Sequence, residues 1–134
     1  MIHLDTSLLV DLLREAARET EGPASRFLAT VQDEELGISV FVACELAAGA
    51  AMSTRPAQEK RRVDRLCEGL HIQYPDEGFP SAYGSLLASQ ERTHRRISTM
   101  DLLIATSALA AGAPLVTRNA KDFLRVPGLD VIAY

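Results

Sequence analysis

Residues 98–123, STMDLLIATSALAAGAPLVTRNAKDF, predict a helix, a strand and a second short helix in immediate succession. Ser98 is a typical residue to begin a helix, and residues 102–111 are almost wholly apolar. The glycine and proline that follow are expected to end this helix. Residues 115–117 then have the length and composition of a buried strand, and residues 119–124 predict the short helix.

The remainder of the chain repeats this alternation of short apolar strands and helices. Further strands are expected at residues 2–4, 36–39, 71–74 and 129–133, and further helices from residue 6, at 23–33, from 40 to about 52, at 56–69 and from 80 to about 96. The strands lack polar alternation, which indicates a sheet that is covered on both faces. We therefore predict one α/β domain over residues 1–134, a three-layer sandwich with a mostly parallel central sheet of about five short strands.

Composition and charge limit the classes of function. The 134 residues are 47% hydrophobic and 24% charged, as expected for a folded domain with a core. The net charge is −4, which excludes a small basic nucleic-acid-binding module. This charge is unevenly distributed, with −6 over residues 1–54 and +2 over residues 55–134. The asymmetry is compatible with an acidic site beside a basic surface.

The placement of the cysteines and the composition of the apolar stretches exclude several classes of protein. Cys44 and Cys67 lie far apart in the sequence, which excludes a disulfide scaffold and a cysteine-rich zinc site. The first seven residues lack the basic start of a signal peptide. The longest apolar stretch, residues 102–116, is too short to span a bilayer. We expect a cytoplasmic protein with reduced thiols and no membrane contact.

Three acidic residues lie in strongly apolar surroundings with no neighbouring lysine or arginine. They are Asp5 after the first strand, Glu45 on the helix after the second strand, and Asp101 near the start of the apolar helix. An ionised carboxylate in such surroundings is costly unless it is compensated. Ligand sites of open α/β sheets lie at the carboxyl ends of the strands, where these side chains could meet. A divalent cation such as Mg²⁺ or Mn²⁺ would offset their repulsion.

Structural roles are an alternative for each residue taken alone. Residues Ser98 to Asp101 match a capping box, so that Asp101 could serve only to begin its helix. Asp5 could likewise cap the first helix. Asp122 follows Arg118 and other basic residues, and a surface ion pair is its simplest structural role. The shared placement of these acids near strand ends favours a common site.

The sequence resembles a known family, the PIN-domain ribonucleases, and in particular the VapC-type toxins. The matching segments occur in family order and cover almost the whole chain: LDTSLLVDLL (residues 4–13), SVFVACELAAGA (39–50), STMDLLIATSALAAGAPLVTRNAKDF (98–123) and VPGLDVI (126–132). The resemblance is clearest in the last 37 residues. It implies the PIN fold over residues 1–134 as a single domain.

The resemblance also implies roles for individual residues. Asp5, Glu45 and Asp101 become the acidic triad that binds Mg²⁺ or Mn²⁺, and Ser7 stands where asparagine is common. The fourth family position falls within residues 117–122, TRNAKD. Asn119 occupies the place where many members have an acid, so that we expect Asp122 to supply the charge. Thr117 and Asn119 are then supporting residues, with the Asn119 side-chain oxygen capping the short helix.

The implied function is that of a metal-dependent endoribonuclease, the toxin of a type II toxin–antitoxin pair. The resemblance adds an RNA substrate, products with 5′-phosphate and 3′-hydroxyl ends, a VapB-type antitoxin as partner, and a homodimer. No histidine is required, and we expect His3 to be a core residue. The alternative is a non-catalytic PIN-like module that only binds RNA or a partner protein. A phosphatase of the haloacid-dehalogenase type is disfavoured, because Ser7 stands where its second aspartate is expected.

Candidate RNA contacts are basic residues near two of the expected strand ends: Arg92, Arg95, Arg96 and Arg118. Arginines of this kind would bind phosphates and position RNA without recognising its sequence. A solvated helix end, favoured by the helix dipole, is the structural alternative for the first three. The basic residues 60–65 are expected to form a solvated face or an antitoxin contact.

Overall fold

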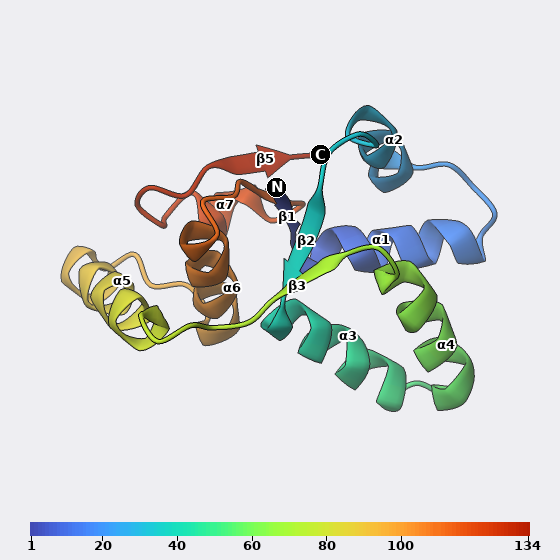
Figure 1. Cartoon of the computed structure of the whole chain (residues 1–134), viewed down its shortest axis with the longest axis horizontal. Helices are drawn as coiled ribbons and strands as arrows, with labels where there is room; N and C mark the ends of the chain where they lie inside the picture. Colours follow the sequence, from blue (N-terminus) through green and yellow to red (C-terminus); the bar gives the residue numbers. More distant parts are fainter.

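The computed structural model describes all 134 residues and contains one five-stranded sheet (Figure 1). The strands lie in the order β3-β2-β1-β4-β5, and every neighbouring pair is parallel. The strands are β1 (Ile2–Leu4), β2 (Leu36–Ser39), β3 (His71–Gln73), β4 (Leu115–Thr117) and β5 (Val131–Ala133). The helices are α1 (Thr6–Ala17), α2 (Pro23–Thr30), α3 (Val40–Ala51), α4 (Pro56–Cys67), α5 (Phe79–Thr93), α6 (Thr99–Ala110) and α7 (Ala120–Phe123).

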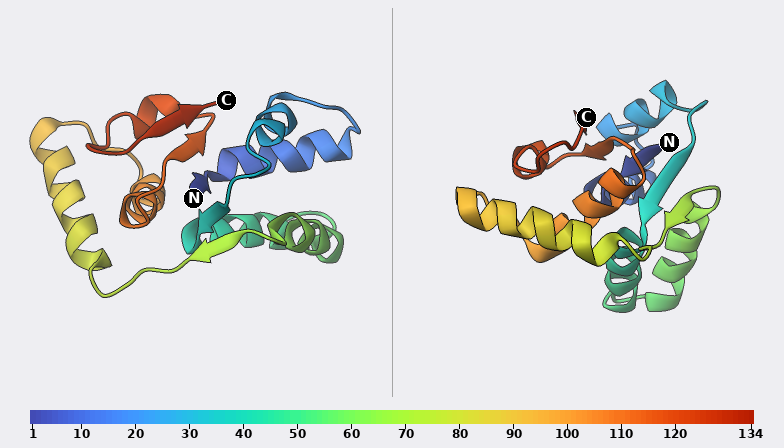
Figure 2. Two further views of the ribbon diagram at one scale, coloured as in Figure 1. Left: turned by 45° about the horizontal axis from the view of Figure 1, so that its top comes forward. Right: turned by 60° about the vertical axis from the view of Figure 1, so that its left-hand side comes forward.

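Helices flank the sheet on both sides, which confirms the predicted α/β sandwich. Figure 2 shows α5 and α6 on one side of the strands, and α1 and α2 on the other. Helices α3 and α4 form a hairpin that packs against α1 (Figure 1). The sheet is wholly parallel where the sequence predicted a mostly parallel one, because helical segments separate all five strands.

The centre of the sheet is β1, which determines where a site can form. Its neighbours are β2 on one side and β4 on the other, so that the chain changes direction across the sheet at this strand. Crevices in open α/β sheets form at the carboxyl ends of strands at such a point. The backbone N–H of Asp5 donates to the Val116 carbonyl at 2.9 Å, which extends the pairing one residue beyond β1. Asp5 therefore lies at the carboxyl end of the central strand, where such a crevice is expected.

The apolar helix predicted from residues 98–123 lies in the centre of the core. Six residues of α6 are buried, and they lie all around the helix rather than on one stripe. A helix that is apolar on every side is stable only when it is enclosed. Helix α6 packs against α5, α3 and β2, which provides that enclosure.

Several predicted boundaries were wrong by one to three residues. Helix α5 ends at Thr93 rather than near residue 96, because His94 adopts a left-handed conformation with φ of 53°. The backbone N–H of Arg95 then donates to the Gln90 carbonyl at 3.0 Å, a typical helix end. Other elements are shorter than predicted: α2 ends at Thr30, α4 at Cys67 and β3 at Gln73, and β5 begins at Val131. Frayed ends of this kind depend on local hydrogen bonds that sequence patterns do not specify.

No helix in the structure combines the length and hydropathy that crossing a bilayer requires. Both cysteines are free thiols: Cys44 is exposed and Cys67 is partly buried. The prediction that they form no disulfide is confirmed.

Candidate active site

The first carboxylate of the site is Asp5, which follows β1 and is only 5% exposed. Its Oδ2 atom accepts hydrogen bonds from Ser7 Oγ at 3.0 Å and from Thr117 Oγ1 at 2.7 Å. Both donors are neutral hydroxyl groups. Asp5 is the N-cap residue of α1 by backbone geometry, but its side chain makes no capping bond. The alternative that the Asp5 carboxylate only caps the helix is therefore wrong.

The second carboxylate is Glu45, which lies on the second turn of α3. Ser39 caps this helix, since its Oγ accepts from the Val42 N–H at 3.2 Å. Glu45 Oε1 accepts a hydrogen bond from Thr6 Oγ1 at 2.6 Å. Thr6 is the first residue of α1, and its hydroxyl is used for this bond to Glu45 rather than for capping the helix. The junction between β1 and α1 thus contains Asp5 and donates a hydrogen bond to Glu45.

The third carboxylate is Asp101 in the first turn of α6. Half of the predicted capping box is present, since Ser98 Oγ accepts from the Asp101 N–H at 3.1 Å. Burial raises the pKa of Asp101, and the charge of Asp5 raises it further. The Ser98 hydroxyl partly offsets these effects, while the charges of Glu45 and Asp122 add to them. The four carboxylates are therefore close enough for their charges to interact.

The fourth carboxylate, Asp122, depends on Asn119 in a way that the sequence did not predict. The expected helix cap by the Asn119 oxygen is absent. The Asn119 Nδ2 amide instead donates to Asp122 Oδ2 at 2.8 Å, and its backbone N–H donates to Thr117 Oγ1 at 2.9 Å. A charged carboxylate is a stronger hydrogen-bond partner for the Asn119 side chain than a neutral backbone N–H group of the four-residue helix α7. Asn119 thus orients Asp122.

We call Asp5, Glu45, Asp101 and Asp122 the acidic cluster. None of its members forms an ion pair, and the five ion pairs of the protein all lie elsewhere. The predicted surface ion pair of Asp122 is absent. Every carboxylate keeps at least one oxygen without a hydrogen-bond donor, because the observed donors contact only one oxygen each of Asp5, Glu45 and Asp122. The chain itself leaves this negative charge uncompensated.

The chemistry of this donor set fits a hard divalent cation. Mg²⁺ and Mn²⁺ prefer carboxylate oxygens and retain several water ligands, so that an open arrangement suits them. In this structure no three acidic, histidine or cysteine side chains are placed so that together they could hold a metal ion. Asp5, Glu45 and Asp101 remain the predicted ligands, with Asp122 as the predicted fourth.

The four candidate RNA contacts lie in two places. Arg92, Arg95 and Arg96 are exposed at the end of α5, and Arg96 pairs with Glu91 at 3.0 Å. Arg118 follows β4, where its Nη1 contacts Asp11 Oδ1. Sequence analysis did not identify Asp11, although it lies four residues after Ser7 and hence on the same face of α1.

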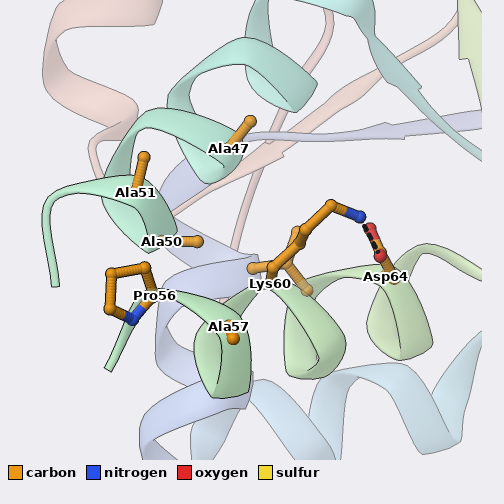
Figure 3. A pocket seen from close by; sticks show the side chains of 8 residues that line it. Ala47, Ala50, Ala51, Pro56, Ala57, Lys60 and Asp64 are labelled. Carbon is orange, nitrogen blue, oxygen red and sulfur yellow. Dashed lines mark hydrogen bonds and ion pairs between the residues drawn. The ribbon is translucent and has the colours of Figure 1, made fainter. Parts of the chain in front are cut away.

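Two other features of the molecule lie apart from the acidic cluster. An apolar hollow of about 390 Å³ lies between α3 and α4, lined mainly by alanines and bordered by the Lys60–Asp64 ion pair (Figure 3). It contains no residue of the acidic cluster. His3 is a core residue as predicted: it is 1% exposed, and burial lowers its pKa to about 4.

Comparisons with known proteins identify the family to which the chain is similar. The sequence model of the PIN domain matches residues 2–129. Ribonuclease VapC1 of Haemophilus influenzae (strain R2866) is 30% identical over 95% of this chain and 92% of that protein. Ribonuclease VapC2 of Rickettsia felis is 34% identical over 73% of each chain.

Solved structures extend the similarity to the whole fold. A chain of VapBC2 from Rickettsia felis, in a crystal structure with a DNA fragment from the promoter, superposes with a TM-score of 0.87 and 29% identity. That match covers 100% of this chain and 99% of the other. A chain of VapBC-1 from nontypeable Haemophilus influenzae superposes with a TM-score of 0.83, at 27% identity and 99% and 98% coverage.

Proposed function

This chain belongs to the PIN-domain family, and we propose that it is a metal-dependent endoribonuclease, the toxin of a type II toxin–antitoxin pair. Relatives named Ribonuclease VapC match it over nearly its full length. Structures similar to it over the whole chain are those of VapBC complexes. Both observations support an enzyme that cuts RNA and is held in check by a bound partner protein.

The observation that carries the proposal is the arrangement of the acidic cluster. The charges of the other three carboxylates act on Asp101, three of the four accept hydroxyl or amide donors, and none pairs with a cationic side chain. Such an arrangement costs stability unless a ligand compensates it. A module that only binds a partner has no need of it.

The roles of the chain's own residues follow from their contacts. Ser7 and Thr117 fix the orientation of Asp5, and Thr6 fixes that of Glu45. A bound Mg²⁺ or Mn²⁺ would activate a water molecule and offset charge that develops on the phosphoryl oxygens. The carboxylates would hold that ion, while the exposed Arg92 and Arg95 would bind RNA phosphates.

The proposed partners are an antitoxin of the VapB type and a second copy of this chain. The similar structures are those of VapBC proteins, one of them bound to a DNA fragment from the promoter. We propose that the enzyme acts in the cytoplasm, where its RNA substrate is found. A short open reading frame beside the gene, whose product suppresses growth arrest when both are expressed, would support the toxin role.

Removal of the metal tests the catalytic part of the proposal. Purified protein should cleave single-stranded RNA with Mn²⁺ or Mg²⁺, lose this activity in excess EDTA, and regain it when the cation is restored. Asp101→Asn should lower the rate at least about 10²-fold, since it removes a charged metal ligand. Asp64→Asn is the matched control, because it removes the same charge from the exposed Lys60–Asp64 pair. Undiminished cleavage in EDTA would overturn the metal-dependent mechanism, and RNA binding without cleavage would favour the interaction module.

A further inference from the structure

We propose that Asp11 holds the Arg118 guanidinium away from the acidic cluster and so keeps its carboxylates free for a cation. The inference rests on the proposed function, because it assigns a purpose to the unpaired carboxylates. The acidic cluster has no cationic partner, yet the backbone of an arginine is hydrogen-bonded beside it. That arginine is paired elsewhere, and the residue that pairs with it is Asp11.

The backbone of Arg118 is bonded directly into the site. Its N–H donates to Ser7 Oγ at 3.1 Å, and Ser7 Oγ donates in turn to Asp5 Oδ2 at 3.0 Å. The preceding residue, Thr117, also donates to Asp5 Oδ2. The Asp5 carboxylate thus lies two hydrogen bonds from the Arg118 backbone, and the arginine side chain is long and flexible.

The Arg118 side chain is paired with Asp11. This aspartate lies one turn after Ser7 on α1, and its side chain is only 17% exposed. Its Oδ1 atom contacts Arg118 Nη1, and Arg14 Nη1 lies 3.8 Å from the same oxygen. The Asp11 carboxylate is thus the only acid that Arg118 contacts.

Tyr134 braces Asp11 from outside α1. Its hydroxyl donates to Asp11 Oδ2 at 2.6 Å, so that both carboxylate oxygens have a partner. The ring of Tyr134, which follows β5, lies against Phe27 of α2 with the centroids 6.3 Å apart. Burial and the bond to Asp11 raise the pKa of Tyr134, which keeps the phenol protonated as a donor. The orientation of Asp11 on α1 is therefore fixed by contacts with one residue that follows β4 and one that follows β5.

Removal of Asp11 would release a cation beside the acidic cluster. Arginine pairs with carboxylates through two parallel hydrogen bonds, and such a pair would occupy the oxygens that a metal ion needs. Asp11 is therefore a positioning residue, which acts on the site through Arg118. A purely structural role would differ, because removal of Arg118 would then weaken the site as much as removal of Asp11.

Calorimetric titration of Mn²⁺ into the RNA-free protein tests the proposal with a readout other than activity. Asp11→Asn should weaken Mn²⁺ binding about tenfold, whereas Arg118→Gln should leave it unchanged or strengthen it. The double variant should recover the affinity of the unmodified protein within about threefold. Asp64→Asn is the control for the change in net charge and should bind Mn²⁺ normally, because its partner Lys60 is exposed on α4.

Two further measurements distinguish a weakened metal site from a variant that fails to fold. Tyr134→Phe removes the brace without changing charge and should weaken Mn²⁺ binding about two- to threefold, less than Asp11→Asn. Thermal unfolding of each metal-free variant identifies any that fails to fold, in which case Tyr134→Phe decides. Unchanged binding in Asp11→Asn, or a double variant as weak as Asp11→Asn, would overturn the proposal. Absence of Mn²⁺ binding by the unmodified protein would instead overturn the proposed function.

Discussion

Carboxylates in the acidic cluster and carboxylates on the α1 and α4 surface have different kinds of partner. The acidic cluster is held by neutral donors from Thr6, Ser7, Thr117 and Asn119. The surface acids instead pair with cations: Asp11 with Arg118, Glu59 with Arg62 at 2.7 Å, and Asp64 with Lys60 at 2.5 Å. Cationic side chains of the protein thus neutralise the surface acids, but they leave the negative charge of the acidic cluster without an ionic partner.

This difference separates structural charge from charge that is kept for a ligand. An exposed ion pair such as Lys60–Asp64 contributes only about 0–1 kcal/mol, so that Asp64 can be replaced at little cost. The acidic cluster carries mutual repulsion, which is visible in the raised pKa of Asp101. Removal of one of its charges should therefore impair function while leaving stability unchanged or improved.

The largest expected effect comes from Asp5→Asn. RNA cleavage should fall at least about 10²-fold, since the change removes a charged ligand from the centre of the acidic cluster. The midpoint of thermal unfolding in the absence of metal should stay the same or rise, because repulsion with Asp101 is relieved. Cleavage assays and calorimetry measure the two effects. A loss of stability that parallels the loss of activity would remove the distinction between the two regions.

Thr117→Val tests the neutral donors themselves. The side chain is fully buried, and valine has nearly the same shape, so that the change removes mainly the hydroxyl. Asp5 Oδ2 loses one of its two donors, and the Asn119 N–H loses its acceptor. We expect cleavage to fall about tenfold and stability to fall by about 1 kcal/mol. Thr117→Ser, which retains the hydroxyl, should recover most of the activity, and failure of this rescue would assign the loss to packing.

Charge reversal at Arg95 and Arg96 tests whether the cations near the site serve RNA. The double change to glutamate should weaken RNA binding severalfold and lower the salt dependence by about 0.7 for each phosphate that the variant no longer neutralises. Mn²⁺ affinity should change little. Binding titrations at several salt concentrations provide the measurement. An unchanged salt slope would indicate that both arginines belong to the ordinary solvated surface.

Glu15→Gln tests a carboxylate on α1 that serves structure alone. Glu15 accepts hydrogen bonds from the backbone N–H groups of Gly22, Ala24 and Ser25 and from the Ser25 hydroxyl, and so closes the start of α2. Desolvation opposes its ionisation, but these bonds outweigh it and lower the pKa of Glu15 below its ordinary value of 4.5. The variant should lose about 1 kcal/mol of stability at pH 7.

The pH dependence of this loss has a definite sign. A lowered pKa in the folded state stabilises the protein above the unfolded-state pKa, and the stabilisation is lost as the pH falls through the folded-state pKa. The difference in stability between the unmodified protein and Glu15→Gln should thus shrink below pH 4.5. Urea unfolding at several pH values measures it. A difference in stability that does not depend on pH would show that the carboxylate charge does not stabilise the start of α2.

The smallest expected effect is that of Lys60→Ala. Its partner Asp64 lies four residues later on α4, and both side chains are more than half exposed. Such a pair contributes about 0.3–0.5 kcal/mol, and cleavage should not change. Urea unfolding of this variant at low and high salt provides the measurement. A loss of activity would mean that the α4 surface takes part in the reaction or in partner binding.

The sequence predicted the architecture and most of the acidic cluster for identifiable reasons. The apolar run of α6, followed by glycine and proline, fits only an enclosed helix that ends before a strand. Asp5, Glu45 and Asp101 are acids in apolar surroundings, and the order of short strands and helices places them near the carboxyl ends of a parallel sheet. Local composition and chain order were sufficient for these inferences.

Contacts between distant residues could not be predicted in this way. The bond from Thr6 to Glu45 joins residues 39 positions apart, and that from Tyr134 to Asp11 joins residues 123 positions apart. Asn119 was expected to cap α7, but it orients Asp122, because a carboxylate had come within reach of its amide. The left-handed turn at His94, which places Arg95 and Arg96 beyond α5, likewise depends on bonds at the helix end.

The sequence by itself thus determined the order of the chemistry-bearing residues along the strands, the apolar core and the acids that a cation would need. Only the tertiary structure decided which hydrogen-bond donors contact each acid and which acids have no cationic partner. The physical reason is that hydropathy patterns act over one helix or strand, whereas a hydrogen bond requires two atoms to come within about 3 Å of each other. In this protein that choice separates Asp5, which is held by hydroxyls, from Asp11, which is held by Arg118.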